Sequence, residues 1–245
     1  MTHLVAGAGL RGLACALTLA KAGEKVTLVD ARQEIGTPSV GIGYSINNKV
    51  MDWINSLNPP ELLQIKKHDR CWGMRIEWLE KLLAQRVGEE GVDIIVKTRI
   101  ISHNSGSDEE ILHVRGAGPN DPKILSATKI YDCLGDQPTR PGWPGSFTVL
   151  GRAPRTDLVE WSGAISIPER IPNEWKHHGW DGERLAFTRA DGTIECWMKG
   201  TNCEPKHPNG WLETLSALLP NNPNEISIDT PIEEGITMAQ CTLDI

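Results

Sequence analysis

Long apolar runs and clusters of basic residues are both absent from this sequence of 245 residues. A membrane-spanning helix needs about 20 consecutive apolar residues, and no stretch approaches that length. The 25 Lys and Arg form no run and are outnumbered by 32 Asp and Glu, so the formal net charge is −7. Binding to nucleic acid requires a concentrated positive field, and the composition argues against that class. We therefore expect a globular cytoplasmic protein with no membrane span and no nucleic-acid partner.

Closely spaced cysteines are also absent, because the six cysteines include no CxxC pair and no ladder of short spacings. Scattered cysteines are typical of a reducing compartment. We expect six thiols without disulfides, at Cys15, Cys71, Cys133, Cys196, Cys203 and Cys241. The adjacent His177 and His178 have no further ligand at a spacing suited to zinc. We interpret this pair as part of a solvated loop and expect no metal site.

Tyrosine and phenylalanine are scarce, with two of each, whereas tryptophan occurs nine times. Six of the tryptophans follow residue 141, namely Trp143, Trp161, Trp175, Trp180, Trp197 and Trp211. Wide flat side chains suit a pocket for an apolar or aromatic ligand. They equally suit the core of a small sheet that contains little phenylalanine, so both interpretations stay open.

The amino-terminal segment contains the most specific motif. Apolar residues at 3–6 predict a strand, GAGLRG at 7–12 predicts a turn, and residues 13–22 are rich in Ala and Leu at helical spacing. A second strand is predicted over 25–29 and ends at Asp30. This order of strand, glycine turn, helix, strand and acidic residue is typical of a dinucleotide-binding βαβ unit.

Each glycine of the motif has its own physical role. Gly7 permits the tight turn, Gly9 lets the backbone approach a pyrophosphate, and Gly12 lets the helix pack closely on the strand. Free N–H groups at the helix amino terminus attract phosphates, and the Asp30 carboxylate accepts hydrogen bonds from ribose hydroxyls. In the alternative interpretation the glycines only shape a turn and Asp30 is a solvated strand end.

The run VAGAGLRGLACALTLAKAGEKVTLVDAR, residues 5–32, resembles the FAD-dependent oxidoreductases of the aromatic-hydroxylase type, the family of para-hydroxybenzoate hydroxylase. Fainter similarities follow in EIGTPSVGIGYSINNKVMDWINSL, residues 34–57, and at Arg75, which opens a helix. The resemblance implies an α/β fold with two domains. A Rossmann-like βαβ domain that binds FAD or NAD(P) is expected over residues 1–140, and an antiparallel β-sheet substrate domain with a short helix over 141–245.

By position, the resemblance implies FAD as the cofactor. It places the FAD pyrophosphate at Gly7, Gly9 and Gly12, the adenosine ribose at Asp30, and the adenine at Arg32. The complete set of expected cofactor-binding residues is Gly7, Ala8, Gly9, Leu10, Arg11, Gly12, Asp30, Ala31, Arg32, Gly43, Arg75 and Gly135. No catalytic residue is assigned, because a flavin carries the chemistry itself.

Several of these assignments have an open alternative. Arg11 contacts a phosphate or the isoalloxazine, or it faces solvent. Arg32 contacts the adenine or is a surface charge, and Gly41 and Gly43 either approach the flavin ring or belong to a flexible loop. Gly135 ends a predicted strand, but the Gly135-Asp136 pair is not assigned as the family's second flavin motif, because that motif follows the substrate sheet.

The remaining elements are predicted from periodicity and turn residues. The first domain is expected to contain a helix over 74–87, strands over 92–96, 99–102 and 129–133, and a hairpin over 111–124. After a linker at 137–141, strands are expected over 149–151, 160–167, 184–188 and 193–199, and a short helix over 210–219. A two-residue hairpin turn is predicted at Asp191-Gly192.

In this family the chain returns to the nucleotide domain after its substrate sheet. We expect this returning segment to be absent here, because the sequence ends at 241–245, where the segment should begin. Three functions stay open. The first is a FAD-binding, monooxygenase-like oxidoreductase that acts on a small apolar or aromatic substrate. The second is a flavin-fold protein that catalyses cyclisation or isomerisation, or one half of a split flavoenzyme completed by a partner subunit. The third is an NAD-binding dehydrogenase, which the similarities at 41–48 and Arg75 disfavour.

Overall fold

The computed structural model describes residues 1–37, 41–60, 63, 65–68, 71–106, 109–119, 123–135, 150, 155–200 and 210–243. The chain divides into two compact units, and neither is one continuous stretch. The first consists of Met1–Ser39, Glu80–Arg155 and Pro231–Ile245, and the second of Val40–Leu79 and Thr156–Thr230. This division differs from the expected boundary at residue 140, because the chain leaves the first unit early and re-enters it at its carboxyl end.

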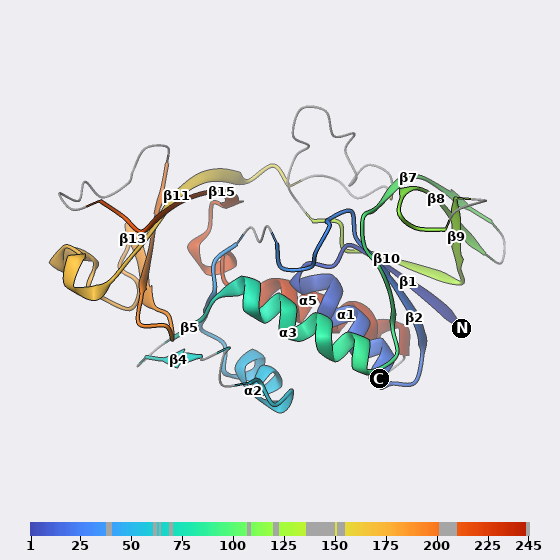
Figure 1. Ribbon diagram of the computed structural model, residues 1–245, viewed down its shortest axis with the longest axis horizontal. Helices are drawn as coiled ribbons and strands as arrows, with labels where there is room; N and C mark the ends of the chain where they lie inside the picture. Colours follow the sequence, from blue (N-terminus) through green and yellow to red (C-terminus); the bar gives the residue numbers. More distant parts are fainter. Residues whose placement is uncertain are drawn as a thin grey trace. The chain divides into compact units, whose positions relative to one another are not determined.

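A four-stranded parallel sheet lies at the centre of the first unit, in the order β10-β1-β2-β6 (Figure 1). The four strands are β1 (Thr2–Ala6), β2 (Lys25–Val29), β6 (Asp93–Ile95) and β10 (Lys129–Asp132). Helix α1 (Leu10–Lys21) connects β1 to β2, and α3 (Ile76–Glu89) precedes β6. The βαβ order predicted from the sequence is confirmed, with α1 beginning at Leu10 rather than at residue 13.

A second sheet of the first unit is an antiparallel meander of three strands. It consists of β7 (Thr98–Ser105), β8 (Glu110–Gly116) and β9 (Ile124–Ala127). The side chains of Ile100, Leu112 and Val114 from this meander pack in one apolar cluster with Leu4 and Val29 of the parallel sheet. The hairpin predicted over 111–124 is therefore confirmed, and the two sheets share a core.

The second unit is built around a five-stranded antiparallel sheet in the order β12-β13-β14-β11-β15. Its strands are β11 (Leu158–Ser166), β12 (Gly179–Trp180), β13 (Arg184–Thr188), β14 (Ile194–Lys199) and β15 (Glu213–Pro220). A small sheet of β3 (Tyr44–Ser45), β5 (Trp72–Gly73) and β4 (Lys66–Lys67) and the helix α2 (Asn48–Ser56) belong to the same unit. The predicted antiparallel sheet is confirmed at 160–167, 184–188 and 193–199, whereas 149–151 lies almost wholly outside the described residues.

The helix predicted over 210–219 is wrong, because this segment forms β15 and pairs with β11. Leu215, Ala217 and Leu219 point toward the core, and the residues between them are exposed. This alternation has the period of a strand, and pairing with β11 outweighs the helical preference of Leu and Ala.

The turn between β13 and β14 lies where Asp191-Gly192 predicted it. The Gly192 N–H donates to the Arg189 carbonyl oxygen at 3.2 Å, and the Arg189 N–H donates to the Thr193 carbonyl oxygen at 2.8 Å. Gly192 has a φ of +83°, which a glycine adopts without strain. Three residues, 190–192, therefore separate the hydrogen-bonded Arg189 and Thr193, rather than the two predicted.

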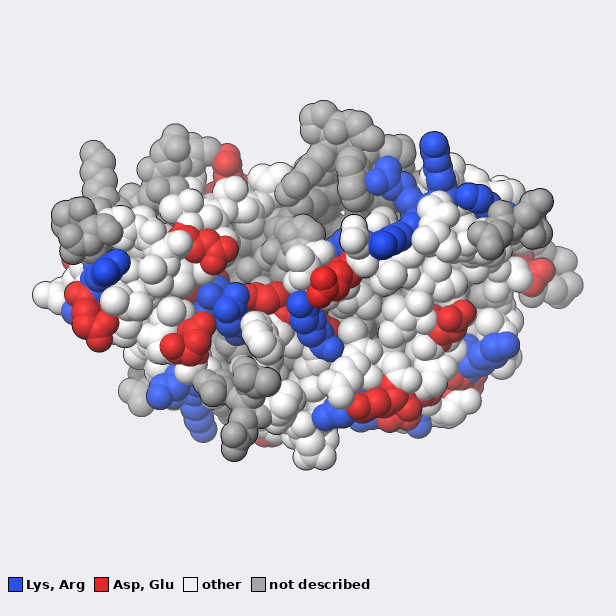
Figure 2. All heavy atoms as spheres, in the orientation of Figure 1, with Lys and Arg blue, Asp and Glu red and all other residues white. Residues whose placement is uncertain are grey.

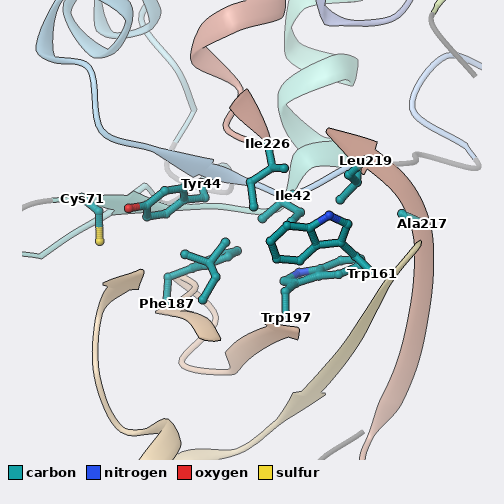
Figure 3. Packing of buried hydrophobic residues seen from close by; sticks show 10 residues of the cluster. Ile42, Tyr44, Cys71, Trp161, Phe187, Trp197, Ala217, Leu219 and Ile226 are labelled. Carbon is teal, nitrogen blue, oxygen red and sulfur yellow. The ribbon is translucent and has the colours of Figure 1, made fainter. Parts of the chain in front are cut away.

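Two of the tryptophans fill the core of the second unit (Figure 3). Trp161 and Trp197 are buried in one cluster with Ile42, Tyr44 and Phe187. A Cβ on Gly163 would lie 2.8 Å from the Trp197 ring, so the strand beside the indole has no room for a side chain. Trp175 is also buried, on a separate cluster, whereas Trp143 lies outside the described residues. Trp161, Trp175 and Trp197 therefore belong to the core of the unit, which is the second of the two interpretations of the tryptophan excess.

The chain returns to the first unit through helix α5 (Asp229–Leu243), contrary to the expectation that this segment is absent. A Cβ on Gly235 would lie 2.1 Å from the Arg11 carbonyl oxygen, so α5 packs directly on α1. Asp229 and Pro231 in the first turn are ordinary signals of a helix start. Asp229 and Pro231 therefore indicate the start of this helix in the sequence itself.

The described residues contain no helix that is long and apolar enough to cross a membrane. Within the same residues, Cys15, Cys71, Cys133, Cys196 and Cys241 carry thiols without disulfides, and Cys203 lies outside them. On the face shown in Figure 2, basic and acidic side chains are interspersed among the described atoms.

Candidate nucleotide-binding site

Backbone contacts explain two of the three glycines in the turn. The Gly7 N–H donates to the Val29 carbonyl oxygen at 2.8 Å, and Gly7 has a φ of +102°. A Cβ on Gly7 would lie 2.3 Å from the Cys133 carbonyl oxygen, and one on Gly12 would lie 1.8 Å from the Gly7 carbonyl oxygen. Helix α1 thus rests directly on the turn, as the motif predicted.

Gly9 differs because no packing among the described residues explains it. Among the described residues, a Cβ on Gly9 would meet only one atom within 4 Å, the Glu80 Oε1 at 4.0 Å. Gly9 is also the N-cap of α1, and it offers no side chain to the N–H groups of the first turn, which contains no acidic residue. An uncapped helix amino terminus beside open space suits an external anion. The turn therefore fits a phosphate group.

Asp30 lies beside the turn because β1 and β2 are parallel and end at the same edge of the sheet. Its carboxylate is buried, with Oδ2 accepting a hydrogen bond from the Ala8 N–H at 2.6 Å and Oδ1 accepting one from the Arg32 N–H at 2.7 Å. The neighbouring Ala31 is exposed. This carboxylate is not the solvated strand end of the alternative interpretation.

The Arg32 guanidinium bridges three groups at this edge. Its Nε donates to Asp30 Oδ1 at 3.1 Å, its Nη1 to Glu80 Oε2 at 3.1 Å and its Nη2 to the Ala8 carbonyl oxygen at 2.7 Å. Burial acts to lower the pKa of Arg32, but the Asp30 and Glu80 carboxylates outweigh it and raise the pKa above its usual value. Arg32 is therefore a fixed cation of the site and not an isolated surface charge.

Glu80 is a member of this cluster that sequence reasoning missed. It is 6% exposed and lies on α3, four residues after Ile76 and three before Leu83. This spacing places a carboxylate on the apolar stripe of the helix. A charge on an apolar stripe is a signal of a buried ion pair, and the sequence showed it.

Arg11 is buried and contacts the returning helix. Its Nε donates to Glu234 Oε2 at 2.6 Å, and its Nη2 forms an ion pair with the same oxygen. The solvent-facing alternative for Arg11 is therefore wrong. Leu10 is buried beside it at the start of α1.

Gly135 follows β10 with a φ of +90°, and a Cβ there would meet no described atom within 4 Å. The Cys133 N–H donates to the Ala6 carbonyl oxygen at 2.8 Å, which holds the end of β10 against the end of β1. Asp136 lies outside the described residues.

The other two expected residues, Gly43 and Arg75, belong to the second unit. A Cβ on Gly43 would lie 1.9 Å from the Met74 carbonyl oxygen, and the Met74 N–H donates to the Gly43 carbonyl oxygen at 2.8 Å. Packing within this unit thus accounts for the glycine. Arg75 is partly exposed and pairs with Glu77 at 2.5 Å and with Asp191 at 3.9 Å.

Asp229 is a second buried carboxylate that sequence reasoning missed, at the start of α5 in the second unit. Its Oδ1 accepts a hydrogen bond from Ser45 Oγ at 2.5 Å, and its Oδ2 accepts one from the Ile46 N–H at 2.9 Å. The carboxylate therefore ties α5 to the segment that follows β3.

The described residues contain no group of three or more His, Cys, Asp and Glu that could hold a metal ion. His178 is exposed and stacks on His68 with ring centroids 3.6 Å apart, and His177 Nε2 lies 3.7 Å from Asp181 Oδ2.

Residues 5–50 match the family described as NAD(P)-binding Rossmann-like domain. No curated protein matches the chain by sequence. Among solved structures, a geranylgeranyl bacteriochlorophyll reductase-like protein from Thermoplasma acidophilum has a TM-score of 0.69 at 13% identity, over 99% of this chain and 78% of that one.

Two further solved structures have a fold similar to that of this chain. The aromatic hydroxylase CabE from angucycline biosynthesis has a TM-score of 0.61 at 13% identity, over 99% of this chain and 62% of that one. The Diels-Alderase PyrE3 from pyrroindomycin biosynthesis has a TM-score of 0.60 at 16% identity, over 82% of this chain and 47% of that one. The chain thus spans less than two thirds of the length of either protein. The chain shares with these proteins a mixed α/β fold with a Rossmann-like parallel sheet and additional antiparallel sheets, as the resemblance implied.

Proposed function

We propose that this chain is a FAD-binding oxidoreductase, monooxygenase-like, that acts on a small apolar or aromatic substrate. The observation that carries the proposal is the Gly9 backbone beside the buried Asp30 carboxylate. Among the described residues, no side chain caps α1 there, and a Cβ on Gly9 would meet one atom within 4 Å. The fold shared with an aromatic hydroxylase supports the monooxygenase-like reaction and the substrate class. Scattered cysteines support a cytoplasmic location.

Different residues of the first unit would bind different groups of FAD. The N–H groups at the start of α1 would bind the pyrophosphate, because the helix dipole and the uncapped donors favour an anion there. Asp30 would accept a hydrogen bond from the adenosine ribose, and Arg32 would lie beside the adenine. Bound FAD would supply the redox chemistry, while the protein orients the substrate and excludes water.

Absorbance and released-cofactor identification of the purified chain test this proposal. We expect a flavin spectrum in stoichiometric amount, or its appearance after incubation with FAD. FMN, which lacks the adenosine half, is expected to bind far more weakly than FAD. A chain that binds no FAD but binds NAD would instead support the dehydrogenase.

Likeness to the Diels-Alderase PyrE3 favours a second candidate, a flavin-fold protein that catalyses cyclisation without net redox change. Reduction of the bound flavin by NADH or NADPH, with reoxidation accelerated by an aromatic substrate, would support the monooxygenase-like reaction. Product formation without flavin reduction would support the cyclase. Because α5 supplies a returning segment, the reason for a completing partner subunit no longer applies.

A further inference from the structure

Two carboxylates and one guanidinium form the charged cluster beside the glycine turn. Asp30 and Glu80 are both buried, with 9% and 7% of their side chains exposed, and the Arg32 side chain is 22% exposed. These three groups together carry one net negative charge. Buried carboxylates are costly unless they are paired, so Arg32 is held strongly by both.

Arg32 is ambiguous in the sequence, because an arginine near the end of the second strand accommodates the 2′-phosphate of NADP in some Rossmann folds. In this structure its Nε, Nη1 and Nη2 already donate to Asp30, Glu80 and the Ala8 carbonyl oxygen. A 2′-phosphate could recruit Arg32 only by drawing it away from buried carboxylates.

Glu80 also lies close to where a nucleotide would bind. Its Oε1 is 4.0 Å from the position of a Cβ on Gly9, at the open side of the turn. A 2′-phosphate would bring further negative charge toward Asp30 and Glu80, with one guanidinium to compensate. Like charges in a partly buried site repel strongly.

We propose that Glu80 is a specificity-determining residue, which ties Arg32 to Asp30 and restricts the site to nucleotides whose adenosine ribose carries free hydroxyls. The site would accept FAD, NAD or ADP-ribose and reject their 2′-phosphorylated counterparts. This inference rests on the proposed nucleotide-binding function and assigns the ribose chemistry of that site.

Calorimetric titration of the full chain with ADP-ribose and with 2′-phospho-ADP-ribose tests the inference. We expect the wild type to prefer ADP-ribose by at least about a hundredfold, because the added phosphate meets two carboxylates. In Glu80→Gln, one negative charge is lost and the Arg32 Nη1 loses its carboxylate partner, so the preference should fall about tenfold through tighter binding of the phosphorylated ligand.

Glu89→Gln is the matched control, because it removes the same charge from the same helix at a partly exposed position where Glu89 pairs with Arg86. It should keep the wild-type preference. If Glu80→Gln folds poorly, the double variant Arg32→Gln/Glu80→Gln serves instead, because it removes both members of the Arg32–Glu80 ion pair. Because the cation is missing, it should show no tighter binding of 2′-phospho-ADP-ribose than the wild type.

An unchanged preference in folded Glu80→Gln would overturn the inference, as would an equal loss of affinity for both ligands. If Glu80→Gln does not fold, tighter binding of 2′-phospho-ADP-ribose by the double variant than by the wild type would overturn it. FAD titration of the same proteins separates the two proposals. A wild type that binds ADP-ribose but not FAD would refute the FAD proposal and leave the ribose preference measurable, whereas a wild type that binds neither would refute both.

Discussion

Each unit contains an arginine and carboxylate cluster, and the two clusters differ in what surrounds them. In the second unit, Glu195 Oε2 accepts a hydrogen bond from Arg189 Nε at 2.7 Å and forms an ion pair with Arg189 Nη2 at 2.6 Å. Glu195 Oε1 accepts a hydrogen bond from Trp197 Nε1 at 2.5 Å. Burial raises the pKa of Glu195, and Arg189 and Trp197 act in the opposite direction. In the first unit, the cluster around Arg32 lies beside the open side of Gly9.

The difference separates a structural ion pair from the proposed nucleotide-binding site. Glu195 is fully enclosed, so its contacts serve the folding of the antiparallel sheet. Asp30, Arg32 and Glu80 adjoin helix donors that no described side chain caps, so their charges act on whatever approaches the turn. Variants in the Glu195 cluster should therefore change the free energy of unfolding, and variants in the Arg32 cluster should change the affinity for the nucleotide.

The largest expected effect on stability belongs to Glu195→Gln, which leaves the buried Arg189 without its counter-charge. Such a change costs about 3–5 kcal/mol of unfolding free energy. Urea denaturation measures the loss, and Glu160→Gln at an exposed position of β11 is the control and should cost little. A loss below about 1 kcal/mol, the value typical of an exposed pair, would remove the distinction between the clusters.

Gly9→Ala should lower the affinity for FAD about a hundredfold, because its methyl group occupies the space that a pyrophosphate needs. The melting temperature should stay near the wild-type value, since the new Cβ meets only the Glu80 Oε1 at 4.0 Å among described atoms. Flavin fluorescence titration measures the affinity. Gly88→Ala is the matched control, because its Cβ would also lie 4.0 Å from the nearest described atom, Ile94 Cδ1. Equal FAD affinities in the two variants would contradict the proposed pyrophosphate site.

Arg32→Gln should weaken FAD binding about tenfold, because Asp30 and Glu80 lose their shared cation and repel the phosphates. FMN binding should change less, since FMN has no adenosine to meet this edge. A parallel titration with both flavins measures the ratio. If Arg32→Gln lowered the affinities for FAD and FMN equally, Arg32 would not act on the adenosine part of FAD.

Gly192→Ala should have the smallest effect, a stability loss of about 1 kcal/mol from a φ of +83° with open space around the new Cβ. FAD affinity should not change, because the new Cβ meets no described atom within 4 Å and the loss of stability is small. Thermal unfolding and the FAD titration together check the expectation. A change in FAD affinity would show that the turn influences the nucleotide site.

Local patterns predicted the first unit well. The glycine turn, Asp30 and the strands beside them follow from spacing within about 30 residues, and the structure has them in that order. Glu80 was missed because its importance depends on Arg32, which is distant in the chain. Residues 210–219 were assigned to a helix because Leu and Ala favour one locally, whereas pairing with β11 decides their structure. The packing of Gly43 on Met74 likewise depends on tertiary contact.

The contact between Gly235 and the Arg11 carbonyl has a consequence for the order of synthesis. The glycine turn and α1 leave the ribosome well before α5, the helix that packs on α1. Domains that are continuous in sequence fold during translation from the amino terminus. Because residues 231–245 belong to the first unit, a nascent chain that stalls before residue 231 would leave uncovered the part of α1 on which Gly235 packs.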